Sequence, residues 1–152
     1  MDHIKEMLSV GRICDLSAIT KDEALVELCE LSSASPVVKN REKFLDAIRK
    51  RELMMSTGIG GGIAIPHSKT SALSDFVMSV GRTVQGIDFD SLDGLPVHLI
   101  LMIGASDTQG EEFLRVLKYI GMIFSDDQTL DRLMAASGPE EIYNILVHRA
   151  EQ

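Results

Sequence analysis

A nearly continuous apolar run, VHLILMIGA from Val97 to Ala105, constrains the fold of this chain more than any other segment. A half-exposed strand alternates apolar with polar side chains, whereas a strand buried on both faces is apolar at almost every position. The run contains His98 and is about half as long as a membrane-spanning helix. We therefore expect the residues from Val97 to Ile103 to form a buried central strand.

Helical and strand patterns alternate along the rest of the chain, which is typical of the α/β class. A first helix is expected to begin at Thr20, because Thr20 and Glu23 match a capping box, and to end at Ser35-Pro36. The glycine-rich segment 56–62 is expected to lack regular structure. Further helices are expected over about 40–52, from the capping patterns at Thr108 and Ser125, and from Ser137; further strands are expected over 63–65, 76–82 and 87–89.

The size and charge of the chain exclude several classes of protein. Its 152 residues, 45% hydrophobic and 25% charged, favour one domain with one core, over residues 1–152. The net charge of -8 leaves no basic patch to neutralise phosphates, which argues against a nucleic-acid partner. Residues 1–6 lack the basic and apolar regions of a signal peptide. These features predict a cytoplasmic protein that does not insert into membranes.

The cysteines and histidines show no spacing typical of a metal site. Cys14 and Cys29 lie in apolar contexts and form no CxxC pair, so two reduced core thiols are expected rather than a disulfide. His3 and His148, near the termini, are expected to be solvated, and His98 to be a core or strand-end residue. No HExxH-like motif is present, so we expect no metal and no cofactor.

The segment RELMMSTGIGGGIAIPHS, residues 51–68, contains a glycine-rich run with two interpretations. Glycines can adopt positive φ angles, and successive free amides can form a concave anion site. Hydroxyl groups beside them can add donors, but such residues are equally typical of turns and flexible loops. No Gly-Lys-Ser/Thr follows, so this is not a Walker A motif. The candidate phosphate-binding loop consists of Ser56, Thr57, Gly58, Gly60, Gly61 and Gly62.

His67 follows the expected strand 63–65 and Pro66, at a strand end where α/β proteins often bind ligands. Pro66 fixes its own φ angle and favours an extended Ile65. Neutral imidazole, with a reference pKa of about 6.5, is a good nucleophile near pH 7 once a hydrogen bond orients one nitrogen and leaves the other free. A single histidine is, however, more often a structural residue, so both interpretations stay open.

Arg51 is expected on the same helix face as Phe44 and Ile48. A cation on that face should meet either a carboxylate or a bound anion, and the planar guanidinium suits phosphate. The alternative is a charge near the C-terminus of the helix that complements the helix dipole.

The run from Gly58 to His67, GIGGGIAIPH, resembles the active-site signature of the type-2 enzyme IIA family of the bacterial phosphoenolpyruvate-dependent phosphotransferase system. This family includes the mannitol, fructose and nitrogen-regulatory IIA domains. The signature begins with an acidic or amide residue, here Glu52, and ends with the Ile-Ala-Ile-Pro-His core. The similarity extends over nearly the whole chain. It implies a single domain with a mixed sheet of roughly five strands, flanked by helices on both sides.

The resemblance also implies the function of a phosphoryl carrier. His67 would accept a phosphoryl group on Nε2 from an HPr-type phosphocarrier, and would pass it to, or signal through, a downstream regulatory target or a IIB protein. Arg51 matches the family arginine, and with the loop amides it would stabilise the transferred group. The resemblance implies no cofactor and no metal.

Two positions depart from the family pattern. Ser68 stands where a small residue, mostly glycine, follows the histidine, and Phe113 stands where many relatives carry a second histidine. The signature segment most resembles the nitrogen-regulatory and fructose-type members, and a single domain without fused segments favours a stand-alone regulatory IIA. Two alternatives stay open: a IIA component that feeds a fructose- or mannitol-type permease through a IIB protein, and a non-catalytic binding module that keeps the fold and an anion pocket.

Overall fold

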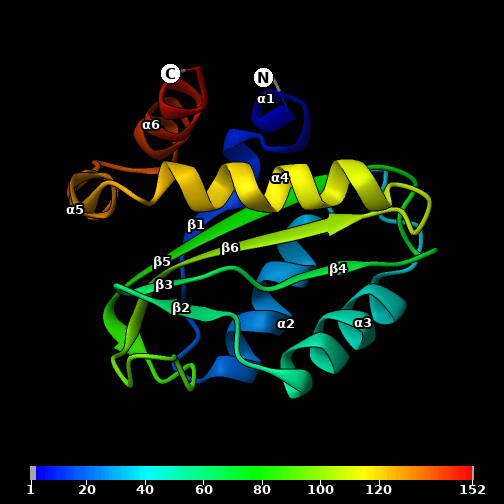
Figure 1. Ribbon diagram of the computed structural model, residues 1–152, viewed down its shortest axis with the longest axis horizontal. Coiled ribbons are helices and arrows are strands. Elements are labelled where there is room, and N and C mark those ends of the chain that lie inside the picture. The colour runs from blue at the N-terminus through cyan, green and yellow to red at the C-terminus, as the bar shows by residue number, and fades with distance from the viewer. Residues whose placement is uncertain (1–2, 152) are drawn as a thin grey trace.

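In the computed structural model, which describes residues 3–151, the apolar run forms β6 (Val97–Ala105) in the middle of a six-stranded sheet (Figure 1). On one side β6 pairs antiparallel with β5 (Val77–Ile87). On the other side it pairs in parallel first with β3 (Ile63–Ala64) and then with β4 (His67–Lys69). The outer strands are β1 (Ile13–Asp15), parallel to β5, and β2 (Gly58–Gly60), antiparallel to β3. The predicted central strand and the mixed sheet are confirmed.

Side chains along β6 alternate between the two faces of the sheet, and each face has its own layer of helices. Leu99, Leu101 and Ile103 pack into one apolar cluster, and Ile100 and Met102 pack into the other; all five are fully buried. The first cluster includes α1 (His3–Met7), α4 (Gly110–Ile123), α5 (Asp127–Ala135) and α6 (Pro139–Glu151), and the second includes α2 (Lys21–Ser32) and α3 (Arg41–Met54). The predicted helices on both sides are confirmed, and burial on both faces explains the lack of alternation in the run.

One predicted helix cap is confirmed and a second is wrong. Thr20 caps α2, because its hydroxyl accepts a hydrogen bond from the backbone N–H of Glu23 (3.2 Å). Thr108 does not cap α4: its hydroxyl bonds that of Ser106 (3.0 Å), and Gln109 is the N-cap residue. The Thr108 hydroxyl therefore forms a hydrogen bond within the turn before α4, and does not bond a backbone N–H of the helix as the sequence predicted.

The predicted cap at Ser125 is also wrong. Its hydroxyl donates to the carbonyl of Met122 (2.7 Å) and so closes the end of α4. Asp126 caps α5 instead, with its carboxylate accepting from the backbone N–H of Gln128 (2.8 Å). A carboxylate is the better cap here because it also interacts favourably with the positive end of the helix dipole.

The strands differ from prediction in three places. Where the sequence predicted strands at 76–82 and 87–89, β5 is one strand with a register shift against β6 between Arg82 and Ile87, where the pairing is irregular. Segment 56–62 is not wholly irregular, because Gly58–Gly60 forms β2. The short strands β1 and β4 were not predicted; a 3-10 turn, η1 (Val10–Arg12), leads into β1.

Both cysteines are free thiols, as the sequence predicts. Cys29 is buried and Cys14 is half-buried, and burial raises the pKa of each thiol to about 11. Both therefore remain protonated and poorly nucleophilic near pH 7. In the described part of the chain, every helix falls short of the length and apolar character of a membrane span, and no trio of His, Cys, Asp or Glu side chains is arranged to hold a metal.

Candidate functional site

The main chain around His67, the first residue of β4, holds its ring in one orientation. Nδ1 lies 2.7 Å from the carbonyl oxygen of Ile65. Because a carbonyl only accepts hydrogen bonds, this contact places the proton on Nδ1 and leaves a free lone pair on Nε2. The segment is fixed to the central strand, since the backbone N–H of Ile103 donates to the carbonyl of Pro66 (2.9 Å) and His67 pairs with Ile103. Nε2 is therefore the ring nitrogen with a free lone pair.

The environment of His67 keeps its imidazole neutral at physiological pH. Burial of this half-buried side chain lowers its pKa below the ordinary 6.5, and the positive charge of Arg51 lowers the pKa further. The hydrogen bond to Ile65 and the negative charge of Glu52 act in the opposite direction. A lowered pKa reduces the fraction of the protonated, non-nucleophilic form at pH 7.

This lowered pKa predicts that His67 weakens folding in mild acid. Above about pH 6.5 the ring is neutral in both the folded and the unfolded chain. As the pH falls below that value, the unfolded chain binds a proton that the folded site resists, so the free energy of unfolding decreases. In urea denaturation, the loss of stability between about pH 7.5 and pH 5.5 should therefore be smaller for His67→Gln than for the wild type. An equal loss in both proteins would contradict the lowered pKa.

Arg51 lies in the last turn of α3 and acts electrostatically on His67, so the structure brings the two predicted catalytic residues together. Its Nη1 donates to the carbonyl of Met55 (2.9 Å), which holds the guanidinium at the end of the helix. Phe44 and Ile48, on the same helix, are fully buried, whereas Arg51 is only half-buried. A guanidinium carries five N–H donors, and the carbonyl of Met55 uses one of them. The others can contact an anion bound at His67.

Phe113 of α4 packs directly against His67. The two ring centroids are 5.7 Å apart and the ring planes are inclined by 53°. Phe113 is buried, and the ammonium group of Lys69 lies 5.9 Å from the centre of its ring. The residue that the sequence comparison placed at a second-histidine position is therefore beside the first histidine, where it provides an apolar wall without a proton to donate.

The glycines at 60–62 form the turn between β2 and β3, not a cradle around His67. Their φ angles are +97°, +66° and +84°, a backbone conformation that favours glycine. The N–H of Gly61 donates to the carboxylate of Asp93 (2.9 Å), which leaves no room there for a second anion. Ile63 pairs with Leu99 and His67 with Ile103, so His67 lies about 13 Å further along β6. For Gly60, Gly61 and Gly62, the expected phosphate-binding geometry is corrected to a hairpin turn.

Ser56, Thr57 and Gly58 also direct their polar groups at the protein itself. The Ser56 hydroxyl donates to the carbonyl of Phe89 (2.5 Å) and accepts from the N–H of Gly58 (3.0 Å). Both the N–H and the hydroxyl of Thr57 donate to the carboxylate of Glu52. These donors are already satisfied, so the expected loop is corrected here to a local turn anchored by neighbouring side chains.

Glu52 is the residue near this site whose role sequence reasoning missed. It was noted only as the first residue of the signature, yet its side chain is 4% exposed and forms an ion pair with Lys21 (2.9 Å). A sequence signal existed: a carboxylate in the last turn of a helix, followed five residues later by a threonine. Such a pattern fits a side chain that accepts from the loop after its helix, but it does not name the loop residue.

The remaining histidines lie elsewhere. His98, the second residue of β6, is half-buried with Nδ1 3.0 Å from the carbonyl of Thr83, so the strand-end interpretation is confirmed. His148 is exposed, as predicted. The prediction for the His3 side chain lies outside the described part of the structure.

The sequence matches a family model described as phosphoenolpyruvate-dependent sugar phosphotransferase system, EIIA 2, over residues 10–149. The nitrogen regulatory protein of Escherichia coli (strain K12) is 35% identical over 143 residues, which cover 90% of this chain and 86% of that protein. The fructose-specific EIIABC component of Bacillus subtilis (strain 168) is 31% identical over 144 residues, which cover 94% of this chain but 23% of that protein. The chain thus spans less than a quarter of the length of this second relative.

Solved structures agree with the sequence match. IIA-Ntr from Neisseria meningitidis has a TM-score of 0.87 at 29% identity, covering 95% of this chain and 99% of that one. The IIA mannitol protein of Escherichia coli, solved in complex with phosphorylated IIB mannitol, has a TM-score of 0.80 at 21% identity, covering 93% and 97%, and shows a shared fold. The family match includes both Arg51 and His67. The chain belongs to the type-2 EIIA family of the phosphoenolpyruvate-dependent sugar phosphotransferase system.

Proposed function

We propose that this chain is a phosphoryl carrier that accepts a phosphoryl group on Nε2 of His67 from an HPr-type phosphocarrier. The observation that carries the proposal is the hydrogen bond from Nδ1 to the carbonyl of Ile65 (2.7 Å), because it fixes the free nitrogen. Burial keeps the ring neutral, and the nearby guanidinium of Arg51 can stabilise the incoming dianionic group. Membership of the EIIA family supports this chemistry.

The transfer needs no cofactor and no water. The Nε2 lone pair of His67 attacks phosphorus in line with the donor's phosphorus–nitrogen bond, and that bond breaks with its electron pair returning to the donor imidazole. The ring of His67 gains a positive charge as the new bond forms, and the donor ring loses one. The carbonyl of Ile65 then stabilises the Nδ1–H of the charged ring, while Arg51 faces the phosphoryl oxygens.

Exposed apolar side chains beside the site suit a protein donor. Leu53 and Met54, which follow Arg51 and Glu52, are 86% and 81% exposed, and Leu114, next to Phe113, is 67% exposed. Exposed large apolar groups next to a site are typical of surfaces that bind proteins. A small-molecule phosphoryl donor would not need such apolar contacts outside the site.

The regulatory branch is the role that we favour, with the phosphorylation state read by a downstream target protein. Phe113 offers neither charge nor a hydrogen bond to a phosphoryl group on His67, so the group lacks a second imidazole that could assist its departure. The alternative is onward transfer to a IIB protein of a sugar permease, which the fructose-specific relative motivates. Incubation of the phosphorylated chain with a cysteine-bearing IIB protein separates the two, because only the alternative predicts that label leaves the chain for IIB.

The decisive experiment is reconstituted labelling with radioactive phosphoenolpyruvate, enzyme I and an HPr-type donor. The wild type should take up one acid-labile, base-stable phosphoryl group per chain, and His67→Ala should take up none. His98→Ala is the matched control and should be labelled like the wild type. Label on His67→Ala, or a folded wild type that no HPr-type donor labels, would contradict the proposal; the second outcome would favour the non-catalytic binding module.

A further inference from the structure

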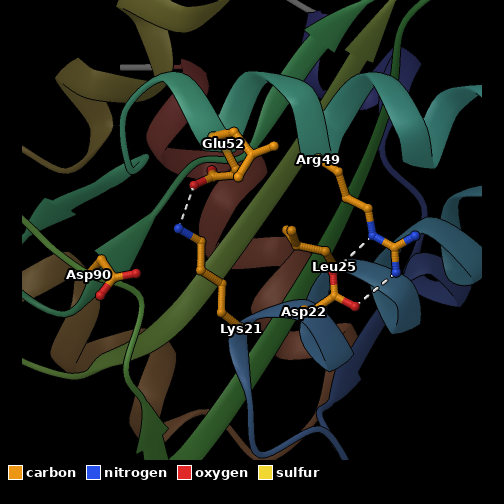
Figure 2. A pocket seen from close by; sticks show the side chains of 7 residues that line it. Lys21, Asp22, Leu25, Arg49, Glu52 and Asp90 are labelled. Atoms are coloured by element: carbon orange, nitrogen blue, oxygen red, sulfur yellow. Dashed lines mark hydrogen bonds and ion pairs between the residues drawn. The ribbon is translucent and has the colours of Figure 1, made fainter.

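Two ion pairs join α2 to α3, and both line one pocket of about 480 Å³ (Figure 2). In the first, Arg49 donates two hydrogen bonds to Asp22, at 2.9 and 2.8 Å, and both side chains are exposed. In the second, Nζ of Lys21 lies 2.9 Å from Oε2 of Glu52, whose side chain is 4% exposed. The two pairs connect the same two helices, but only the second includes a buried side chain, that of Glu52.

Glu52 is fully engaged at its buried position. Its Oε2 accepts from the backbone N–H of Thr57 (3.2 Å), and its Oε1 accepts from the Thr57 hydroxyl. Its cationic partner is fixed as well, because Lys21 also donates to the carbonyl of Phe89 (3.3 Å) and lies 4.7 Å from the centre of the Phe89 ring. A buried carboxylate is tolerated only with such partners, so a shift of Thr57 would cost Glu52 two hydrogen bonds and leave the Lys21 ion pair as its remaining polar contact.

Thr57 connects this carboxylate to the acceptor histidine. The carbonyl of Thr57 accepts from the backbone N–H of Ile65 (3.0 Å), and the carbonyl of Ile65 accepts from Nδ1 of His67 (2.7 Å). Ile65 thus donates its N–H to Thr57 and accepts from His67 with its carbonyl. The location of Thr57 therefore determines where the carbonyl that orients His67 lies.

We infer that Glu52, held by Lys21, is a positioning residue for His67: it fixes Thr57, and through Thr57 the carbonyl of Ile65 that sets the tautomer and orientation of the ring. The inference rests on the proposed role of His67 as acceptor. Glu52 also follows Arg51 in the last turn of α3, so the same carboxylate anchors the helix end that carries the phosphate-stabilising guanidinium.

The Asp22–Arg49 pair provides a matched control. Glu52→Gln and Asp22→Asn each convert one carboxylate of an ion pair between α2 and α3 into an amide of the same shape. The ring tautomer of His67 is read from ¹⁵N chemical shifts with no donor present, and the initial rate of labelling is measured separately. Glu52→Gln should mix the two tautomers and lower the rate by roughly tenfold, since small misplacements of a reacting group cost 10–100-fold. Asp22→Asn should leave the tautomer unchanged and the rate within about twofold.

Two results would overturn the inference: a folded Glu52→Gln with wild-type tautomer and rate, or equal effects of Glu52→Gln and Asp22→Asn. If Glu52→Gln does not fold, Thr57→Val decides the matter, because it removes the hydroxyl but keeps the Lys21–Glu52 pair; an unchanged tautomer and rate would then refute the inference. The tautomer does not depend on a donor. A wild type that stays unlabelled therefore defeats the proposed function, while a tautomer shift in Glu52→Gln still supports positioning.

Discussion

Replacing Arg51 with glutamine should slow phosphorylation of His67 by about 10²–10³-fold, the loss typical when one preorganised donor to a developing charge is removed. The guanidinium is held beside the acceptor by its bond to the carbonyl of Met55, and its charge already acts on the His67 ring. Glutamine keeps a polar head of similar reach but brings no charge to the transferred dianion. The measurement is the initial rate of label uptake from an HPr-type donor, compared as kcat/KM.

The pH and a matched variant isolate this effect. Because Arg51 lowers the pKa of His67, its loss raises that pKa, and the rates are best compared near pH 8, where both proteins hold a neutral ring. Arg49→Gln is the control: it lies two residues earlier on α3, is exposed, and binds Asp22. It should change the rate less than about twofold. Equal rates for Arg51→Gln and the wild type would remove Arg51 from the mechanism.

Replacing Arg82 with methionine should lower the free energy of unfolding by about 2 kcal/mol, because the buried carbonyl of Ala136 loses its donor and a buried acceptor without a donor costs about 1–3 kcal/mol. Arg82 is 7% exposed, and its Nη1 donates to the carbonyls of Leu133 (3.0 Å) and Ala136 (2.7 Å) at the end of α5. Its other nitrogens bind the carboxylate of Asp15 (2.7 and 3.2 Å). Methionine fills much of the volume but donates nothing. Urea denaturation near pH 7 measures the change.

Asp15→Asn shows whether the carbonyls or the ion pair account for this loss. The Asp15 side chain is 64% exposed, so its charge is well solvated and its pairing with Arg82 contributes at most about 1 kcal/mol. Asp15→Asn should therefore destabilise the protein much less than Arg82→Met. Equal losses would instead assign the effect to the ion pair, and Arg82 would not be the residue that secures the end of α5.

Local patterns predicted the parts of the fold whose physics is local. The run from Val97 to Ala105 identified the central strand, because burial on both faces requires apolar side chains throughout. The capping pattern at Thr20 gave the start of α2, because an N-cap bond spans only three residues. The strands β1 and β4 were missed, because segments of three residues carry too little pattern to be recognised.

The candidate site also contains some features that local patterns predict and others that depend on distant residues. His67 and Arg51 were predicted from type and context, and the structure places them together. The glycine run was misassigned because positive φ angles serve a hairpin turn as well as an anion site, and only the carboxylate of Asp93, 32 residues away, occupies the amide of Gly61. No periodicity or spacing could identify a partner at that separation.

His67 shows most clearly what the sequence determined and what the tertiary structure decided. The sequence determined that a histidine stands at the end of a buried strand behind a proline, within a recognisable signature, and this is the residue that we propose as phosphoryl acceptor. The tertiary structure decided which nitrogen is free, through the carbonyl of Ile65, and what surrounds the ring: Arg51 and Glu52 from α3 and the apolar ring of Phe113 from α4. The physical reason is that nucleophilicity depends on burial and nearby charge as well as on proton location, and segments distant in the chain set the burial and the charge.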